Sequence, residues 1–275
     1  MRKPGAADRS LSRARLIVYQ CILAATVVGF WYAMTTPGLV SEPFARNTAF
    51  FFGKPHEVGR VVVEWFVSGK IYPHLAITLL ETLLAFAVGS ILGLGVGLWL
   101  ALSPTASALA EPYITALNAM PRVILAPIFA VWFGLGVASK VALGVTLVFF
   151  IVFFNVYQGV KEVSPVVLAN ARMLGASPRQ LLRHVYLPSA TSWVFSSLHI
   201  AVGMAFVGAV VGEYLGSARG VGYLIAQAEG AFDINTVFAG ILVLTAFALV
   251  LDFAVARVER RLLVWRPTQG ETEQL

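Results

Sequence analysis

Five ionisable residues interrupt long apolar stretches of this 275-residue chain and are the first candidates for chemistry: Glu81, Arg122, His199, Glu213 and Asp252. A charge at the centre of a lipid bilayer costs at least about 2.5–3.5 kcal/mol, so a charge in such a stretch is a candidate for function. No two of the five have the spacing of a catalytic pair, and the sequence lacks the phosphate-binding pattern G-x-x-x-x-G-K-[ST]. The sequence therefore predicts that this chain is not an enzyme and does not itself hydrolyse ATP.

Two placements are open for Arg122. If its apolar run begins near Pro112, the rise of 1.5 Å per helical residue puts Arg122 about 15 Å deep, where it would attract an anionic substrate. If the run begins at Val123, Arg122 is an anchor at the membrane interface. The sequence alone does not choose between a pore residue and an anchor.

The other four ionisable residues have plainer interpretations. Glu213 ends an apolar run on the external side, where it either helps a gate or caps the bundle. Glu81 lies near the start of its run and is expected to snorkel or to pair. Asp252 is expected to form an ion pair with Arg257. His199, alone in the middle of its run, is expected to be a hydrogen-bonded packing residue more than a ligand.

The composition identifies the class of protein. Hydrophobic residues make up 58% of the chain and charged residues only 12%, against about 25% charged in an ordinary globular domain. One cysteine and four histidines exclude a disulfide framework and a cysteine-based metal site. The net charge of +6 is dispersed and not gathered in one tract, so no nucleic-acid partner is expected. We expect a membrane protein whose main partner is the lipid bilayer.

Apolar runs of about 20 residues, enough for a helix to cross a bilayer core about 30 Å thick, recur six times. Each run is expected to be helical, because lipid offers no hydrogen-bond partner to the backbone N–H and C=O groups. Pro121 and Pro127 are expected to kink the third run. The sequence thus predicts an all-α membrane protein with six spans. The runs are Leu16–Met34, Leu75–Leu102, Pro112–Ser139, Val141–Val160, Val185–Gly212 and Ile234–Leu251.

Basic residues orient the predicted spans. Most of the 20 Lys and Arg residues lie in the N-tail, the 161–187 connection and the C-tail, which the positive-inside rule places in the cytoplasm. The opposite side holds fewer: Arg46, Lys54, Arg60, Lys70, Lys140 and Arg219. The predicted organisation is a cytoplasmic N-tail (1–15), a first span (16–34), an external connection (35–72) with a short amphipathic helix near 58–67, a transmembrane bundle (73–262) and a cytoplasmic C-tail (263–275).

Small residues recur at intervals of four in two of the runs, a spacing that lets membrane helices approach closely. Ordinary helix packing and a sliding surface between two halves of the bundle both fit this pattern. The rows are Gly89, Gly93 and Gly97 in the second run, and Ala201, Ala205 and Ala209 in the fifth.

The connection between the fourth and fifth runs carries the most specific local signals. Ser164 followed by Pro165 is typical of an N-cap and a first helical residue, and Gly175 is typical of a helix end. Ser177, with Gln180 three residues later, repeats the start signal as a capping box. The sequence predicts two short helices here.

The two short helices are predicted to meet at a sharp turn at 175–177 and to form a hairpin that projects into the cytoplasm. The second helix is expected to end by Tyr186, because Pro188 disfavours helical geometry at Leu187. The hairpin either enters a groove on a partner protein or lies on lipid headgroups. The basic residues for the second alternative are Arg172, Arg179 and Arg183.

The same segment resembles the EAA loop of ATP-binding-cassette (ABC) importer permeases. Ala169-Asn170-Ala171, Gly175 and Val185-Tyr186-Leu187-Pro188 follow its spacing, although Ala169 stands where the loop has an acidic residue and Asn170 where it has the first alanine. The likeness extends from about Pro73 to Pro267. Four further segments resemble the nitrate, sulfonate and taurine branch: Trp132-Phe133-Gly134-Leu135-Gly136, Gly212-Glu213-Tyr214-Leu215-Gly216, Gly220-Val221-Gly222-Tyr223-Leu224 and Glu259-Arg260-Arg261-Leu262-Leu263.

The resemblance implies the transmembrane domain of a type I ABC importer in a bacterial inner membrane. Two permease subunits, two cytoplasmic ATPase subunits that bind ATP and Mg, and a periplasmic or lipid-anchored binding protein would import a small anion such as nitrate, a sulfonate, taurine or bicarbonate. This chain itself would hold no cofactor or metal, and the EAA-like loop (165–188) would be the coupling helix. The implied ATPase-coupling residues are Ala171, Gly175, Ala176, Ser177, Arg179, Leu187 and Pro188. The candidate substrate-path residues are Arg122, Trp132, His199 and Glu213.

Three alternatives are weighed against this interpretation. A self-sufficient secondary transporter would usually show inverted repeats with broken helices, and no such repeat is detected. A membrane-embedded enzyme needs clustered histidines or carboxylates at the cytoplasmic ends of the spans, which the sequence lacks. Import of a vitamin precursor or an aromatic compound by the same ABC mechanism stays open.

Overall fold

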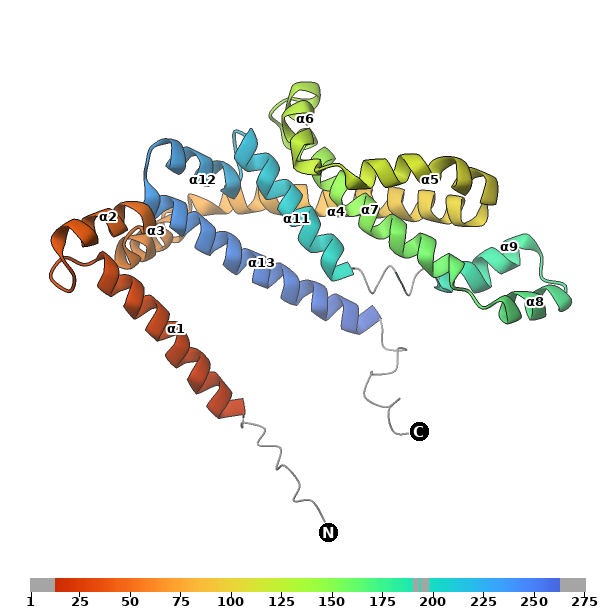
Figure 1. Cartoon of the computed structure of the whole chain (residues 1–275), viewed down its shortest axis with the longest axis horizontal. Helices are drawn as coiled ribbons and strands as arrows, with labels where there is room; N and C mark the ends of the chain where they lie inside the picture. Colours follow the sequence, from red (N-terminus) through yellow and green to blue (C-terminus); the bar gives the residue numbers. More distant parts are fainter. Residues whose placement is uncertain (1–12, 190–192, 194–197, 263–275) are drawn as a thin grey trace, which may run out of the picture.

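The computed structural model describes residues 13–189, 193 and 198–262, which form helices joined by loops (Figure 1). The prediction of an all-α protein is confirmed for these residues, apart from one isolated bridge between Pro37 and Val40. The helices are α1 (Arg13–Thr35), α2 (Glu42–Phe52), α3 (Pro55–Val67), α4 (Ile71–Leu102), α5 (Pro104–Ala119), η1 (Arg122–Ile124), α6 (Leu125–Phe133), α7 (Val137–Lys161), α8 (Pro165–Met173), α9 (Pro178–Leu181), η2 (Leu182–Tyr186), α11 (Leu198–Leu215), α12 (Val221–Gly230) and α13 (Ile234–Leu262).

Four described helices, α1, α4, α7 and α13, are each long and apolar enough to cross a bilayer. A fifth candidate is the pair formed by α5 and the segment Arg122–Phe133, which is bent by 79°. The remaining predicted run corresponds to the shorter apolar helix α11. Residues 190–192 and 194–197 of that run lie outside the described residues, so the count of six spans stays a prediction.

The break between α5 and α6 has a local cause. Met120 is extended (φ −71°, ψ 133°), as expected for a residue that precedes proline, and Pro121 follows it. The predicted kink at Pro121 is confirmed. The kink predicted at Pro127 is wrong, because Pro127 is the third residue of α6, where a backbone N–H has no partner within the helix. The helix before the break begins at Pro104, earlier than the predicted start at Pro112.

The connection over 35–72 is more helical than the sequence predicted. The amphipathic helix near 58–67 is present as α3, but α2 was not predicted, and neither was α12, later in the chain. Trp31, near the end of α1, lies 5.8 Å from Phe238, near the start of α13, as measured between ring centroids. The helices α1 and α13 are therefore antiparallel, so α1 begins and α13 ends on the same side of the bundle (Figure 1).

The core is the packing of α7 between α4 and α11. A Cβ atom added to Gly93 of α4 would lie 2.8 Å from the carbonyl oxygen of Phe149, and one added to Gly208 of α11 would lie 2.5 Å from the Cα atom of Gly144. Ala201, Ala205 and Ala209 are fully buried. The rows of small residues thus serve close helix packing, the plainer of the two predictions for them.

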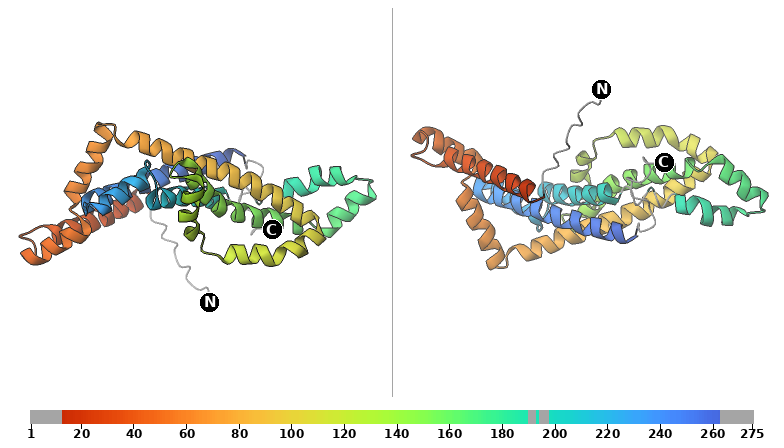
Figure 2. Two further views of the ribbon diagram at one scale, coloured as in Figure 1. Left: turned by 90° about the horizontal axis from the view of Figure 1, so that it is seen from above. Right: turned by 90° about the horizontal axis from the view of Figure 1, so that it is seen from below.

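The two ends of the bundle carry different elements. Helices α8 and α9 project at one end, and α2 and α3 lie at the other, as the views from above and below also show (Figure 2). The C-terminal end of α7 leads into α8, and its N-terminal end lies near α6 and α11.

Candidate functional site

The turn between α8 and α9 is fixed by hydrogen bonds to the helix ends. Gly175 has φ +82°, a conformation that side-chain-bearing residues rarely adopt, and the N–H of Ala176 donates to the carbonyl of Ala171 at 3.0 Å. The Ser177 N–H donates to the Gln180 side chain at 2.7 Å, and the Gln180 N–H donates back to the Ser177 hydroxyl at 3.4 Å. The predicted capping box is confirmed.

The predicted end of the second short helix at Tyr186 is wrong. The chain widens into a π-helix (Leu182–Tyr186), the N–H of Leu187 donates to the carbonyl of Leu182, and helical geometry continues through Pro188 to Ser189. Proline clashes with the carbonyl four residues earlier in a regular helix, and the wider turn relieves this clash. The wide turn therefore lets the helix continue past Pro188.

Two large apolar side chains are exposed beside the turn of this α8–α9 hairpin, residues 165–188. Met173 and Leu174 are 81% and 89% exposed. The base of the hairpin is attached to the bundle, because the hydroxyl of Ser189 donates to the carbonyl of Gly159 at 2.8 Å and Tyr186 packs on the core.

The residues predicted to couple to an ATPase fall into two groups on the hairpin. One group surrounds the exposed turn, where Ala171 and Ala176 are half-buried and the other members are exposed. The second group lies on the returning helix, where Leu187 is half-buried and Pro188 exposed. The first group is Ala171, Gly175, Ala176, Ser177 and Arg179.

Arg122 lies at the break between α5 and α6, as the first residue of η1, and the choice between a pore residue and an interfacial anchor stays open. Its guanidinium donates to the carbonyl of Asn118 at 3.1 Å and to the side chain of the same residue. Its Cζ atom lies 4.6 Å from the centroid of the Phe150 ring, a cation–π distance. The break thus places a cation beside an aromatic surface of α7, and its contact with a substrate stays a prediction.

Trp132 and His199 belong to different ends of the bundle. Trp132, near the end of α6, is 69% exposed and contacts the rings of Phe129 and Phe133. His199, in the first turn of α11, places Nδ1 2.8 Å from a carboxylate oxygen of Glu259. The two residues therefore do not form one site within the described chain.

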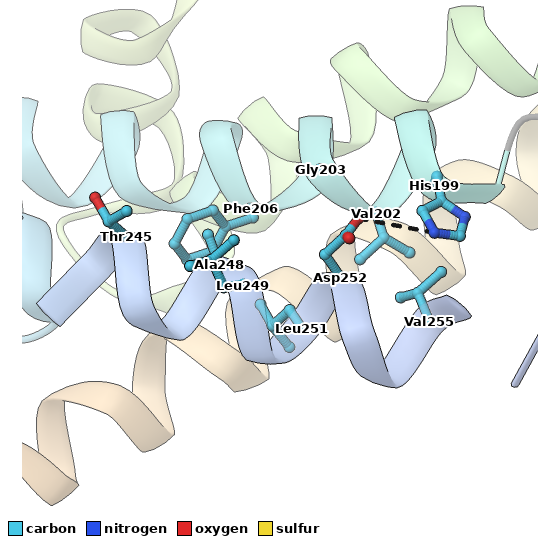
Figure 3. Close-up of a pocket in the computed structure, with 10 residues that line it drawn as sticks. All are labelled: His199, Val202, Gly203, Phe206, Thr245, Ala248, Leu249, Leu251, Asp252 and Val255. Carbon is cyan, nitrogen blue, oxygen red and sulfur yellow. Dashed lines mark ion pairs between the residues drawn. The ribbon is translucent and has the colours of Figure 1, made fainter. Parts of the chain in front are cut away.

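His199 also meets Asp252 across a shallow pocket between α11 and α13 (Figure 3). The Nε2 atom of His199 lies 3.7 Å from Oδ1 of Asp252. The predicted pairing of Asp252 with Arg257 is not formed, because residues five apart do not share a helix face, whereas Asp252 and Glu259, seven apart, do. His199 is a paired residue at a helix junction, in line with the plainer prediction for it.

Sequence reasoning missed a buried group of polar residues near the start of α7, here named the polar junction: Thr78, Glu81, Lys140, Glu213 and Gly222. Glu213 is fully buried, and its two carboxylate oxygens accept from the Thr78 hydroxyl at 2.6 Å and from the Gly222 N–H at 2.8 Å. Lys140 was expected on the external surface, but it is 1% exposed and donates to the carbonyl of Leu135 at 2.5 Å. Glu81 is 2% exposed and does not snorkel.

The polar junction joins four segments distant in sequence. Thr78 and Glu81 come from α4, Lys140 from α7, Glu213 from α11 and Gly222 from α12. Gly220, at φ +108°, brings the start of α12 so close that a Cβ atom there would collide with the Glu213 carboxylate. The spacing of Thr78 and Glu81, three residues apart on one helix face, was the available signal, but nothing in the sequence named their partners.

Comparison with known proteins identifies relatives of the chain. Residues 89–264 match the family described as "Binding-protein-dependent transport system inner membrane component". A Bacillus subtilis protein named as the aliphatic sulfonates transport permease SsuC is 31% identical over 89% of this chain and 86% of its own length. The Escherichia coli taurine transport system permease protein TauC is 29% identical over 88% of this chain and 87% of its own length. The Halalkalibacterium halodurans formylaminopyrimidine transport permease protein ThiX is 34% identical over 72% of this chain and 79% of its own length.

Solved structures give the same fold. An inward-facing structure of the MetNI methionine ABC transporter matches with a TM-score of 0.60 and 19% identity, over 68% of this chain and 94% of that chain. An amino acid ABC transporter determined with histidines matches with a TM-score of 0.56 and 19% identity, over 72% of this chain and 96% of that chain. The family match covers more than half of the sequence and agrees with this fold. The chain belongs to the binding-protein-dependent transport system inner membrane components, the permease subunits of bacterial ABC importers.

Proposed function

We propose that two copies of this chain, each with six spans and both tails in the cytoplasm, form the translocation path of a type I importer. In this arrangement residues 1–15 and 263–275 are the cytoplasmic tails, 35–72 face the periplasm and 73–262 are the permease domain. The antiparallel course of α1 and α13 supports both tails on one side. The excess of Lys and Arg in the tails and in the 161–187 connection supports the cytoplasmic side.

The observation that carries the proposal is the apolar turn of the α8–α9 hairpin. Met173 and Leu174 are almost fully exposed at the tip of a capped, stiff pair of helices. Exposed apolar side chains that cluster at a projecting tip mark a protein interface more than a solvated surface. We assign the tip to a groove of a cytoplasmic ATPase subunit, so that movement of the groove reaches α7 and α11 through the hairpin base.

The partners follow from this assignment. Two ATPase subunits bind ATP and Mg, and this chain binds neither. An external binding protein, periplasmic or lipid-anchored, delivers the solute to the face that carries α2, α3 and α12. Each partner favours a different state of the path, which is all that alternating access requires.

The proposed solute is a small anion of the nitrate, sulfonate, taurine or bicarbonate kind. The names of SsuC and TauC support this class, and the guanidinium of Arg122 at the α5–α6 break supplies a cation for it. The name of ThiX supports a second candidate, a vitamin precursor imported by the same mechanism. A thermal-shift screen of sulfonates, nitrate and pyrimidines against the binding protein encoded with this chain separates the two classes.

Gly175→Val tests the coupling assignment. A β-branched residue at φ +82° strains the turn, while the open space around Gly175 means that no neighbour is displaced. We expect at least about a tenfold loss of coupled uptake and of substrate-stimulated ATP hydrolysis in the reconstituted complex, equivalent to about 1.4 kcal/mol. The matched control is Gly59→Val in α3, which also has open space around it but has no positive φ.

Two results would contradict the proposed function. Intact uptake and ATP hydrolysis in the Gly175→Val complex would remove the hairpin from the coupling path. Uptake by the isolated chain, driven by an ion gradient without ATPase subunits, would instead identify a self-sufficient secondary transporter.

A further inference from the structure

The carboxyl groups of Glu81 and Glu213 lie side by side inside the polar junction. Both are almost completely shielded from solvent, and they are within hydrogen-bonding contact of each other. The Oε2 atom of Glu81 is buried and has no hydrogen-bond partner among the described residues. An ionised carboxylate is only an acceptor, so two of them in contact form a hydrogen bond only when one carries a proton.

The hydrogen-bond donors decide which carboxyl is the charged one. Glu213 accepts from the Thr78 hydroxyl and the Gly222 N–H, and donors of this kind favour the ionised form. Among the described residues no donor reaches the buried Oε2 atom of Glu81, so an ionised Glu81 would keep an oxygen without a hydrogen bond, which is the costlier arrangement. The favoured state is a neutral Glu81 that donates its proton to an ionised Glu213.

The local charge count agrees with this assignment. Lys140 is the cation beside both carboxyls, and its ammonium is held by the carbonyl of Leu135. One ammonium, one carboxylate and one carboxylic acid add up to a neutral cluster. Two ionised carboxylates would leave a net negative charge buried among α4, α7 and α11.

We propose that Glu81 is a buried proton-binding site, at which one exchangeable proton joins Glu81 to Glu213 and holds α4 against α11 and the start of α12. The ligand is the proton itself. The inference does not depend on the proposed transport function, because the site lies within one chain.

The other ionisable groups around the site come from the same elements and their loop. His74 of α4 hydrogen-bonds to the carbonyl of Gly220 at 3.0 Å, and Lys70 and Arg219 lie near His74. As pH rises, loss of the proton places two like charges in contact, so the stabilisation is present at lower pH and is lost at higher pH. We therefore expect the thermal stability of the chain to fall in alkaline buffer.

Infrared spectroscopy of the purified, full-length chain with isotopically labelled glutamate tests the proposal directly. At neutral pH we expect the carbonyl stretch of one protonated glutamate per chain, which shifts with the label and on exchange into D₂O. The band should disappear in Glu81→Gln and persist in the control Glu64→Gln, which changes an exposed residue of α3. The alkaline fall in Tm should also be absent from Glu81→Gln, because the amide cannot lose a proton.

The wild-type spectrum alone keeps the proposal falsifiable if Glu81→Gln does not fold. No labelled carboxylic-acid band in folded wild-type chain would overturn the proposal, as would a band that persists in Glu81→Gln. A Tm of Glu81→Gln that falls with pH as steeply as that of the wild type would show that another group titrates.

Discussion

The polar junction and the α8–α9 hairpin lie near opposite ends of α7 and use polar residues in opposite ways. In the junction, α4, α7 and α11 supply buried polar side chains and α12 supplies a backbone N–H, and the hydrogen bond from Thr78 to Glu213 joins residues 135 positions apart. Within the hairpin, the hydrogen bonds between described residues join positions no more than five apart, and the apolar side chains of Met173 and Leu174 are exposed beside polar ones.

This difference separates the stability of the chain from its assembly. The polar groups of the junction are buried and face one another, so the junction holds helices of one chain together and is not accessible to a partner. The hairpin is completed by its own local bonds, so its exposed apolar turn is not needed for the fold of this chain. Substitutions in the junction are expected to change the folded chain, and substitutions at the hairpin turn are expected to change only its complexes.

Glu213→Leu should have the largest effect on the folded chain. It leaves the Thr78 hydroxyl, the Gly222 N–H and the Lys140 ammonium without the carboxylate that they face, and removing one partner of a buried charged pair costs about 3–5 kcal/mol. We expect a large fall in Tm and in the yield of purified, detergent-solubilised chain. Glu64→Leu on the exposed face of α3 is the control. Equal losses of Tm and yield in the two variants would show that the junction stabilises the chain no more than an exposed position does.

Gly93→Ala should have an intermediate effect. The added Cβ atom would lie 2.8 Å from the Phe149 carbonyl oxygen and 2.9 Å from the Val152 Cβ atom, so α4 and α7 must separate, at a cost of about 1–3 kcal/mol. Gly95→Ala, two residues along the same helix, meets nothing within 4 Å and should gain up to about 1 kcal/mol of helix propensity. Equal Tm values for the two variants would show that the small-residue row does not set the contact of α4 with α7.

Local sequence signals predicted local structure well. The capping box at Ser177, the helix end at Gly175 and the break at Pro121 are each set by residues within one turn, so their patterns can be read directly. The prediction failed at the second short helix of the hairpin, where the rule that proline ends a helix did not hold. Pro188 was expected to end a helix, but a π-turn five residues long lets the helix continue.

Long-range partners could not be predicted from one sequence. Lys140 was placed among the external charges because it falls between the third and fourth apolar runs, but the fold turns its side chain inward to the Leu135 carbonyl and the two carboxyls. His199 was recognised as a packing residue, while its acidic partners on α13 were not. A charge pattern tells which residues need partners, and only the packing of helices supplies them.

Leu174→Ser should have the smallest effect on the chain and a large one on its complex. Because Leu174 is 89% exposed, its loss should change the unfolding free energy by less than about 0.5 kcal/mol, so Tm of the isolated chain stays unchanged. If the turn enters an ATPase groove, the same substitution replaces an apolar contact with a hydroxyl and weakens copurification of the ATPase. Val67→Ser, at a position 83% exposed at the end of α3, should leave both quantities unchanged. A Leu174→Ser chain that loses stability but keeps its ATPase would reverse the contrast between the two ends of α7, because the hairpin turn would then belong to the fold and not to an interface.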